Sequence, residues 1–367
     1  MKLTKFFAFL FATLTFAACS DGKTDEPSEP TTPASGITLT ADKTTVEIGE
    51  TITFTVTNAE NQDVTADAKI YDMDLNEVGS QIVLTEPGSY RYQAVVGNKR
   101  SNYVVVDVTI AAPKAPADPQ PENFTFNHRS LVIDQTGVNC GYCPVAVDQL
   151  RALEQTEWRQ YYNEVTCHAG DFAIGDPANS AAANALNQFQ DALIPGYPCI
   201  LVNFYGKPAN YGYTEVIKVL NNYVKKEGVD VGVSLSVNGD ASCVYAGAQV
   251  KSGVATKYKV TAWLLENQIY SPGQAGATQD YHKIYNHALR NMSHDYSKSN
   301  VQGGTYSFEA NEVKDFTFRL PITSSTWKYQ NMEVLVVVSA KNSTGKWEVA
   351  NSAVCKINES KEFEYEL

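Results

Sequence analysis

The tetrapeptide Cys140-Gly141-Tyr142-Cys143 constrains this chain more than any other stretch, because of where it lies in the sequence. Residues 129–135 before it read RSLVIDQ and predict a short apolar strand. Pro144 follows the pair directly, and proline fits the first turn of a helix, where its missing N–H is not needed. The cysteines are therefore predicted at a strand-to-helix junction, where free backbone amides and the helix dipole favour a thiolate on Cys140.

Two cysteines separated by two residues can form an exchangeable disulfide or supply half of a tetrahedral zinc site. The helix after the pair is predicted from about Pro144 to Arg159, because apolar residues recur there at helical spacing. A zinc site needs two more ligands, and the adjacent Cys167 and His168 point to opposite faces of a predicted strand. Zinc is therefore disfavoured, while a redox-active disulfide and a purely structural disulfide both stay open.

At these residues the chain resembles the thioredoxin superfamily, and Cys-Gly-Tyr-Cys is similar to the tetrapeptide of bacterial disulfide isomerases. Asp134 stands six residues before Cys140, where thioredoxins carry a buried acid that relays a proton to the second cysteine. Tyr197-Pro198 opens the apolar run 199–202 and resembles the cis-proline loop that faces the cysteine pair in that fold. Asn139 differs from the tryptophan that thioredoxins carry just before the first cysteine.

The resemblance implies a role for each of four residues. Cys140 would attack a substrate disulfide, Cys143 would resolve the mixed disulfide, Asp134 would move the proton and Pro198 would shape the substrate groove. No cofactor is needed for such exchange, so none is predicted.

A more specific resemblance is to a family of outer-membrane lipoproteins from Bacteroidetes-type bacteria, an Omp family named for its twenty-eight-kilodalton member. Its members have a lipoprotein signal, a thioredoxin-like domain with Thr-Gly-x-x-Cys-Gly-x-Cys-Pro and a β-rich C-terminal region. That motif stands here at residues 136–144, and the resemblance runs from about Phe124 to the C-terminus. It implies a location and a fold, but no particular reaction.

The first residues predict export and anchoring to a membrane. A basic start and the apolar run 6–16 make residues 1–18 a lipoprotein signal peptide, and the run is too short to span a bilayer comfortably. Cys19 follows two alanines and is the predicted lipidation site, with a plain signal peptide as the alternative. Ser20 is not the aspartate linked to inner-membrane retention. We therefore expect an outer-membrane lipoprotein that faces the periplasm or the cell surface, with the lipid bilayer as a partner.

Composition and periodicity predict a multidomain protein with α/β and all-β parts. Residues 19–36 are rich in Pro, Thr, Ser and acids and predict a disordered tether. Residues 37–110 alternate with period two between frequent turns and predict an Ig-like β-sandwich. A Pro-rich linker at 111–123 is expected to be stiff and extended. A thioredoxin-like domain at 124–228 and a C-terminal β-sandwich domain at 229–367 complete the prediction.

Within the last two domains the periodicity predicts individual elements. Between 124 and 228 we expect strands at 162–168 and 199–205, a helix capped by Asp176 and ending near 193, and a helix at 214–226. Beyond Val229, period-two alternation predicts six strands, at 231–237, 243–250, 258–265, 313–320, 334–338 and 347–356.

Seven cysteines and a net charge of −12 limit the remaining chemistry. The charge argues against a nucleic-acid partner, which would require a clustered basic surface. With Cys19 assigned to lipid, an exported protein can form disulfides among its other six cysteines, which have fifteen possible pairings. We predict one disulfide between Cys167 and Cys199, on neighbouring strands, and one between Cys243 and Cys355. The alternatives are a third exchanging thiol at Cys199, or free thiols that pack as small apolar groups.

The stretch 281–294 holds three of the five histidines. Their separations of five and seven residues fit neither one helical face nor a strand alternation, so a metal site is not expected. The Asn-His-x-x-Arg segment at 286–290 resembles a recurrent feature of the lipoprotein family, and we expect it to order a domain interface.

Two functions from different classes fit these observations. The first is an outer-membrane-anchored lipoprotein whose thioredoxin-like domain exchanges disulfides with protein thiols or disulfides, as an oxidoreductase or isomerase. The second is a non-enzymatic surface protein for binding or adhesion, with the thioredoxin-like domain as a scaffold, since a fold alone does not grant a function. Exposure on the cell surface would favour the second, and a periplasmic orientation would favour the first.

Overall fold

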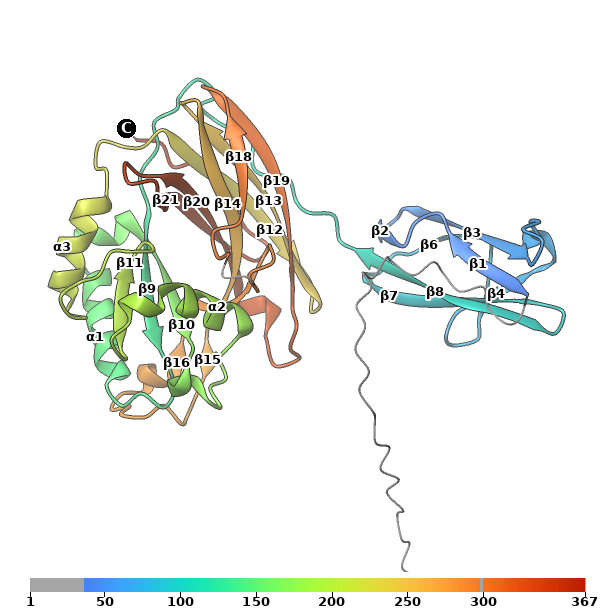
Figure 1. Cartoon of the computed structure of the whole chain (residues 1–367), viewed down its shortest axis with the longest axis horizontal. Coiled ribbons are helices and arrows are strands. Elements are labelled where there is room, and N and C mark those ends of the chain that lie inside the picture. The colour runs from blue at the N-terminus through green and yellow to red at the C-terminus, as the bar shows by residue number, and fades with distance from the viewer. Residues whose placement is uncertain (1–35, 298–299, 367) are drawn as a thin grey trace, which may run out of the picture. The chain divides into compact units, whose positions relative to one another are not determined.

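The computed structural model describes residues 36–297 and 300–366 of the chain (Figure 1). The predicted signal peptide, Cys19 and nearly all of the predicted tether lie outside these residues. The chain divides into two compact units, one with the residues up to Leu84 and Ser89–Asp107, the other with Thr85–Gly88 and the residues from Val108 onward. Among the described helices, none combines the length and the apolar character that crossing a membrane requires.

The first unit consists of two sheets. One has the order β1 (Ile37–Ala41), β3 (Thr51–Asn58), β6 (Gln81–Val83). The other has the order β2 (Thr45–Glu47), β8 (Lys99–Thr109), β7 (Gly88–Val96), β4 (Lys69–Tyr71), β5 (Glu77–Val78). Alternate residues of β3 are buried, and the ring of Phe54 lies 4.8 Å from that of Tyr92 on β7. The period-two pattern therefore produced strands whose apolar faces meet, as the sequence predicted.

A single eight-stranded sheet runs through the second unit. Its order is β11 (Cys199–Val202), β9 (Ser130–Thr136), β10 (Tyr162–His168), β17 (Ala288–Met292), β14 (Thr256–Glu266), β20 (Met332–Lys341), β21 (Trp347–Lys356), and β18 (Gly304–Phe308) also pairs with β14. Strand β10 pairs in parallel with β9, and with β17 through Thr166 and Ala288. The segments 124–228 and 229–367 therefore share one sheet. Pairing with β17 also covers the edge of β10, which would otherwise be open.

A second, antiparallel sheet packs on the C-terminal half of the long sheet. Its order is β19 (Glu312–Pro321), β13 (Cys243–Ser252), β12 (Val231–Gly239), β22 (Ser360–Lys361). Apolar side chains of the two sheets, among them Leu235, Leu264 and Val336, form one core. A short hairpin of β15 (Ile269–Tyr270) and β16 (Ile284–Tyr285) stands apart from both sheets. All six strands predicted beyond Val229 are present, and each is as long as predicted or longer.

Three helices cover the strands β9, β10 and β11. Helices α1 (Cys143–Glu154) and α3 (Tyr213–Tyr223) lie on one face and α2 (Ala181–Gln190) on the other (Figure 1). Helix α1 is shorter than predicted, because Thr156 caps a separate 3-10 helix at Glu157–Tyr161. Helix α2 begins later than predicted, because the Ser180 side chain, and not Asp176, accepts a hydrogen bond from a first-turn amide.

The predicted Pro-rich linker, residues 111–123, belongs to the second unit. Residues from Val108 belong to that unit, and Pro113 packs so closely on β13 that a Cβ at Gly247 would lie 1.6 Å from its carbonyl oxygen. Lys251 is fully buried, and its Nζ donates to Asp118 at 2.7 Å and to the Gln120 carbonyl at 2.8 Å. These contacts hold the segment against the sheet, so the predicted linker packs on the second unit.

The predicted disulfides among the other four described cysteines are wrong, because Cys167, Cys199, Cys243 and Cys355 are free, buried thiols. Cys167 and Cys199 both pair in register with Gln135, so β9 lies between them. Two strand spacings separate their Cα atoms by roughly 9–10 Å, beyond the limit of about 7 Å for a disulfide. Cys243 and Cys355 lie in different sheets. The alternative of small buried apolar groups describes these thiols.

Candidate functional site

Cys140 and Cys143 form a disulfide in the turn between β9 and α1, with their Cα atoms 5.4 Å apart. Pro144 occupies the first turn of α1, as the sequence predicted. Gly137 is required before the pair, because a Cβ there would lie 2.5 Å from the carbonyl oxygen of Phe172. Both cysteines are only 1% exposed. The disulfide is thus placed where exchange chemistry needs it, but it is covered.

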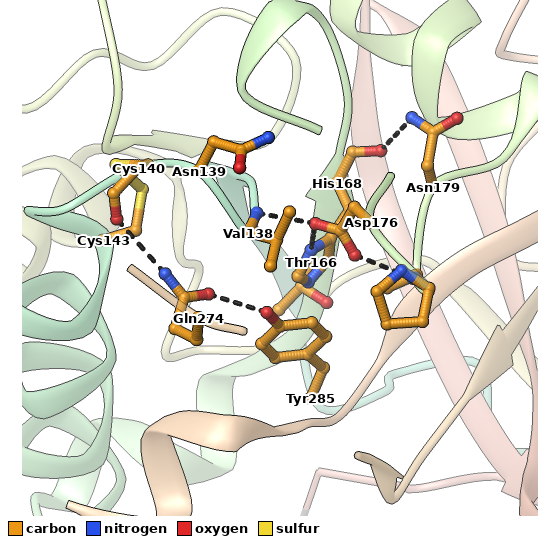
Figure 2. Close-up of polar contacts among 12 residues, drawn as sticks. Val138, Asn139, Cys140, Cys143, Thr166, His168, Asp176, Asn179, Gln274 and Tyr285 are labelled. Atoms are coloured by element: carbon orange, nitrogen blue, oxygen red, sulfur yellow. Dashed lines mark hydrogen bonds and ion pairs between the residues drawn. A yellow bond between two sulfur atoms is a disulfide. The ribbon is translucent and has the colours of Figure 1, made fainter. Parts of the chain in front are cut away.

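One buried acid holds the loop that leads into the disulfide. Asp176 Oδ2 accepts from the Val138 amide at 2.7 Å and pairs with His168 Nδ1 at 2.8 Å, and Oδ1 accepts from the Ala178 amide at 2.8 Å (Figure 2). Burial opposes ionisation of Asp176, but the bonds from His168 and the two amides outweigh it and lower the pKa of this carboxyl. Asp176 therefore orders the cysteine loop instead of capping a helix.

A segment from the C-terminal part of the chain, Ser271–His282, lies over the disulfide loop, and we call it the covering segment. Gln274 Nε2 donates to the Cys140 carbonyl at 3.2 Å (Figure 2). The Ala275 amide donates to the Val138 carbonyl at 2.8 Å. A Cβ at Gly276 would lie 2.0 Å from the Gly141 carbonyl oxygen, so the two backbones are in close contact. Sequence reasoning considered only Tyr281 and His282 of this segment, within the histidine-rich stretch 281–294, and did not place the segment over the disulfide.

The covering segment is also attached to α1. Asp148 accepts from Tyr281 Oη at 2.7 Å and pairs with His282 Nε2 at 2.9 Å, while Arg151 lies 4.1 Å from the centre of the Tyr281 ring. Burial opposes ionisation of Asp148, but the hydrogen bonds from His282 and Tyr281 outweigh it and lower its pKa. The segment is therefore held by both the cysteine loop and the helix that starts at Cys143.

A cavity of about 260 Å³ opens beside the disulfide, between α1, strands β9 and β10 and the residues around Tyr285. Cys143 lines it, together with acids and histidines from these elements. The lining includes Asp134, Thr136, Val147, Leu150, Arg151, Glu154, Glu164, Thr166, His168, Tyr281, His282, Tyr285 and His287. Sequence reasoning had singled out Asp134 and Cys143, and the fold brings them to one cavity.

Asp134 is a buried acid of this cavity with an unpaired oxygen. It is 1% exposed, and its Oδ1 has no hydrogen-bond partner among the described residues. Burial, with a smaller contribution from Glu164, raises the pKa of Asp134 to about 8. Burial likewise raises the pKa of Glu164, against the opposing effect of His287. Asp134 therefore titrates close to neutral pH, where it can give or take a proton.

The Asn-His-x-x-Arg segment lies at the joint between the two halves of the long sheet. The carbonyl of Asn286 accepts from Thr166 Oγ1 at 2.8 Å, and His287 pairs with Glu333 at 2.6 Å. Arg290 is buried and pairs with Glu266 at 2.7 Å. The first bond joins the segment to β10, and the other two join it to β20 and β14. A role in ordering a domain interface stays a prediction.

The bond between Tyr197 and Pro198 is cis, and β11 begins at the next residue. Tyr197 Oη accepts from Asn187 at 2.7 Å, and its ring lies 5.2 Å from that of Phe172, in the loop that contacts Gly137. A cis-proline stands where the resemblance placed it, while a role for Pro198 in binding substrate stays a prediction.

Exposed apolar side chains stand on both segments that flank the disulfide loop. Tyr142 and Val145 at the start of α1 are 72% and 42% exposed, and Phe172 and Ile174 are 42% and 72% exposed. Asn139 connects the two segments, because its Nδ2 donates to the Ile174 carbonyl at 2.8 Å. We call these four side chains the apolar rim, and they are available to a partner.

These elements define a β-rich protein of several sheets with an α/β region that carries a disulfide at a strand-to-helix junction. A protein-family model described as outer membrane protein Omp28 matches residues 186–361, slightly less than half of the chain. This part of the chain is therefore similar to a family of outer-membrane proteins, and the match points to a surface protein. No curated protein matches.

Two solved structures are similar to the chain. HBP35 of Porphyromonas gingivalis matches with a TM-score of 0.52 and 18% identity over 65% of this chain and 78% of that chain, and the likeness shows a shared fold. A protein from Agrobacterium tumefaciens matches with a TM-score of 0.41 and 17% identity over 64% of this chain and 96% of that chain. The second likeness is too low to support an argument.

Proposed function

We propose that this protein is an outer-membrane lipoprotein, anchored through acylated Cys19, whose α/β region exchanges disulfides through Cys140 and Cys143. The observation that carries the proposal is Asp134, a buried acid with an unpaired oxygen that shares a cavity with Cys143. Leaving a polar group buried and unpaired costs about 1–3 kcal/mol. A purely structural disulfide gives no reason to keep such a group, whereas proton transfer to a thiol does.

Exchange with a substrate disulfide takes two steps. The Cys140 thiolate attacks one sulfur of the substrate, which forms a mixed disulfide and releases the other sulfur as a thiolate. Asp134 accepts the proton of the Cys143 thiol, and the Cys143 thiolate attacks the Cys140 sulfur. The Cys140–Cys143 bond closes and the second substrate sulfur leaves, so the substrate is reduced and the protein is oxidised. An acid with a pKa of about 8 is matched to a thiol near neutral pH.

The apolar rim supports a protein as the substrate. Tyr142, Val145, Phe172 and Ile174 expose apolar surface on both sides of the disulfide loop, which an extended chain with a cysteine can cover. By the resemblance to the thioredoxin superfamily, Pro198 forms part of the groove that binds this substrate. The lipid anchor would hold this site at the outer membrane, facing either the periplasm or the cell surface.

A redox titration of the soluble mature protein in thiol buffers tests the proposal. Free thiols are trapped by alkylation, and Cys140 and Cys143 are read by mass spectrometry. We expect a potential between about −120 and −270 mV, the range of known exchange catalysts. A value below about −300 mV is typical of structural disulfides and would contradict the proposal. Cys140→Ser should abolish exchange, while Cys199→Ala should retain it.

One observation favours a second function, a non-enzymatic binding or adhesion protein. Cys140 and Cys143 are each 1% exposed, and Gln274 and Ala275 fix the loop that holds them. In that case the disulfide fixes the loop, and the apolar rim is the binding surface. Protease treatment of intact cells separates the two, because digestion of the anchored protein shows the surface exposure that the binding function requires.

A further inference from the structure

The cavity beside Cys143 offers a second approach to the disulfide, between α1 and the covering segment. We propose that the reductant of the Cys140–Cys143 disulfide is a small aminothiol, which binds in this cavity with its ammonium group at Asp134 and Glu164. The inference rests on the proposed exchange function and adds the class of thiol that regenerates the site.

Access decides which cysteine a reductant can reach. On the loop side, Gln274 bonds to the Cys140 carbonyl (Figure 2). Ala275 bonds to the Val138 carbonyl, and Gly276 lies against Gly141. Cys143, and not Cys140, is among the residues that line the cavity, together with Gln274, Tyr281 and His282 of the covering segment. A thiol inside the cavity is therefore adjacent to Cys143.

Size selects a small molecule. The cavity measures about 260 Å³, just below the roughly 300–1,000 Å³ of pockets for drug-sized ligands. A folded protein cannot enter such a space, and a molecule with a few heavy atoms can. The redox partner on the cavity side is therefore a low-molecular-weight thiol, while the apolar rim serves the protein substrate.

Charge selects a cation. The acids Asp134, Glu154 and Glu164 line the cavity, and Asp134 has an unpaired oxygen there. The bases of the lining are already engaged: His168 with Asp176, His282 with Asp148, His287 with Glu333, and Arg151 with the ring of Tyr281. An ammonium group would donate to the free oxygen of Asp134.

Binding of a cation would also reverse the effect of burial on the two acids. Burial raises the pKa values of Asp134 and Glu164, which disfavours their charged forms. A bound ammonium group favours these charged forms, so it gains two carboxylate partners. The charged forms of these two acids would repel an anionic thiol.

The reaction balances with two aminothiols. The first attacks the sulfur of Cys143 as a thiolate, which breaks the bond between Cys143 and Cys140 and forms a mixed disulfide at Cys143. Cys140 leaves as a thiolate at the start of α1. The second aminothiol attacks the sulfur of the first, and the symmetric disulfide departs. Cys143 then takes a proton from Asp134. Two thiols are oxidised and the protein disulfide is reduced.

The test compares three thiols that differ mainly in charge: cysteamine, 2-mercaptoethanol and 3-mercaptopropionate. The oxidised mature protein is reduced by each at about 0.15 M salt, where the Debye length is about 8 Å and the overall charge of the chain acts weakly. Each rate constant is divided by that of the same thiol with bis(2-hydroxyethyl) disulfide, a neutral reference. This ratio removes differences in thiol pKa and nucleophilicity.

We expect the normalised rate for cysteamine to exceed that for 2-mercaptoethanol by about tenfold or more, which corresponds to at least about 1.4 kcal/mol. 3-Mercaptopropionate should be the slowest. In Asp134→Asn combined with Glu164→Gln, the three rates should converge to within about threefold. Glu157→Gln removes an exposed acid that does not line this cavity, and it should keep the preference. Glu164→Gln alone serves if the double variant does not fold.

Two failures are distinguishable. Normalised rates that agree within about threefold in the unaltered protein would overturn the aminothiol inference while leaving exchange intact. A preference that survives the double variant would also overturn it, because the cavity acids would then not be its cause. Resistance to all three thiols, with a potential below about −300 mV, would instead contradict the exchange function itself.

Discussion

The two faces of β9 and β10 are built from alternate residues of the same two segments, yet they lie in opposite environments. Leu131, Ile133 and Val165 point toward α2 and join a core of buried apolar side chains. Asp134, Glu164 and Thr166 point the other way, where α1 and the residues around Tyr285 leave a cavity. Alternation along a strand therefore separates a packed face from a face that borders the cavity, which we call the reactive face.

The comparison teaches why the cysteines of one chain lie in different chemical environments. Cys167 and Cys199 belong to the packed face, where burial raises the pKa of Cys167 strongly and that of Cys199 to about 11. Thiols in this setting stay protonated and unreactive. Cys143 stands at the start of a helix and at the edge of the cavity. Position relative to the cavity, and not the presence of a thiol, distinguishes the candidate reactive pair.

The largest loss of stability is expected from truncating a side chain on the packed face. Ile133→Ala removes a fully buried side chain from a closed core and should lower the free energy of unfolding by about 2–5 kcal/mol. Val147→Ala, on the half-buried wall of the cavity, should lower it by less than about 1.5 kcal/mol. Denaturant unfolding of the two variants measures the contrast. Equal losses would mean that the cavity wall is packed as tightly as the core.

Asp134→Asn tests the charge on the reactive face. The folded pKa of Asp134, about 8, lies above its unfolded value of 3.8. The folded state therefore keeps a proton that the unfolded state loses, and Asp134 lowers stability progressively as the pH rises from about 4 to 8, by up to about 1.4 kcal/mol per pH unit.

Relative to the unaltered protein, Asp134→Asn should therefore gain stability with rising pH. We expect a gain of about 1–3 kcal/mol at pH 8 that shrinks toward pH 4. Urea unfolding at several pH values measures it. A difference that does not change with pH would show that Asp134 is not a buried, protonated acid.

Gln274→Ala tests the covering segment. It removes the hydrogen bonds to the Cys140 carbonyl and the Tyr285 hydroxyl, each worth about 0.5–1.5 kcal/mol. Reduction of the disulfide by a protein dithiol should become several-fold faster, because the loop side opens more often. Gln160→Ala, at an exposed position, is the matched control. An unchanged rate would mean that the covering segment does not limit access.

The smallest effect is expected from the thiols of the packed face. Cys199→Ala and Cys167→Ala should each leave the exchange rate within about twofold and lower stability by about 1 kcal/mol. Alkylation of the native protein should label neither thiol. Loss of exchange in Cys199→Ala would revive the alternative that Cys199 takes part in exchange, and would erase the distinction between the faces.

Local patterns predicted the elements well. The strand Tyr162–His168 has the predicted bounds, and Pro144 opens α1 as expected, because periodicity and turn chemistry act within a few residues. The predicted start of α2 was wrong for a tertiary reason. Asp176 is a suitable helix cap by type, but in the fold its carboxylate is occupied by His168 and the Val138 amide, so Ser180 caps the helix.

The sequence by itself determined the cysteine pair, the acid six residues before it and the cis-proline candidate, because each depends on residue type and short spacing. Only the tertiary structure decided what surrounds them. Strand order placed β9 between Cys167 and Cys199. The tertiary fold also brought Gln274 onto the cysteine loop, where it bonds to Cys140, 134 residues away in the sequence. Contacts between distant segments depend on how strands pair, and local periodicity does not encode that pairing.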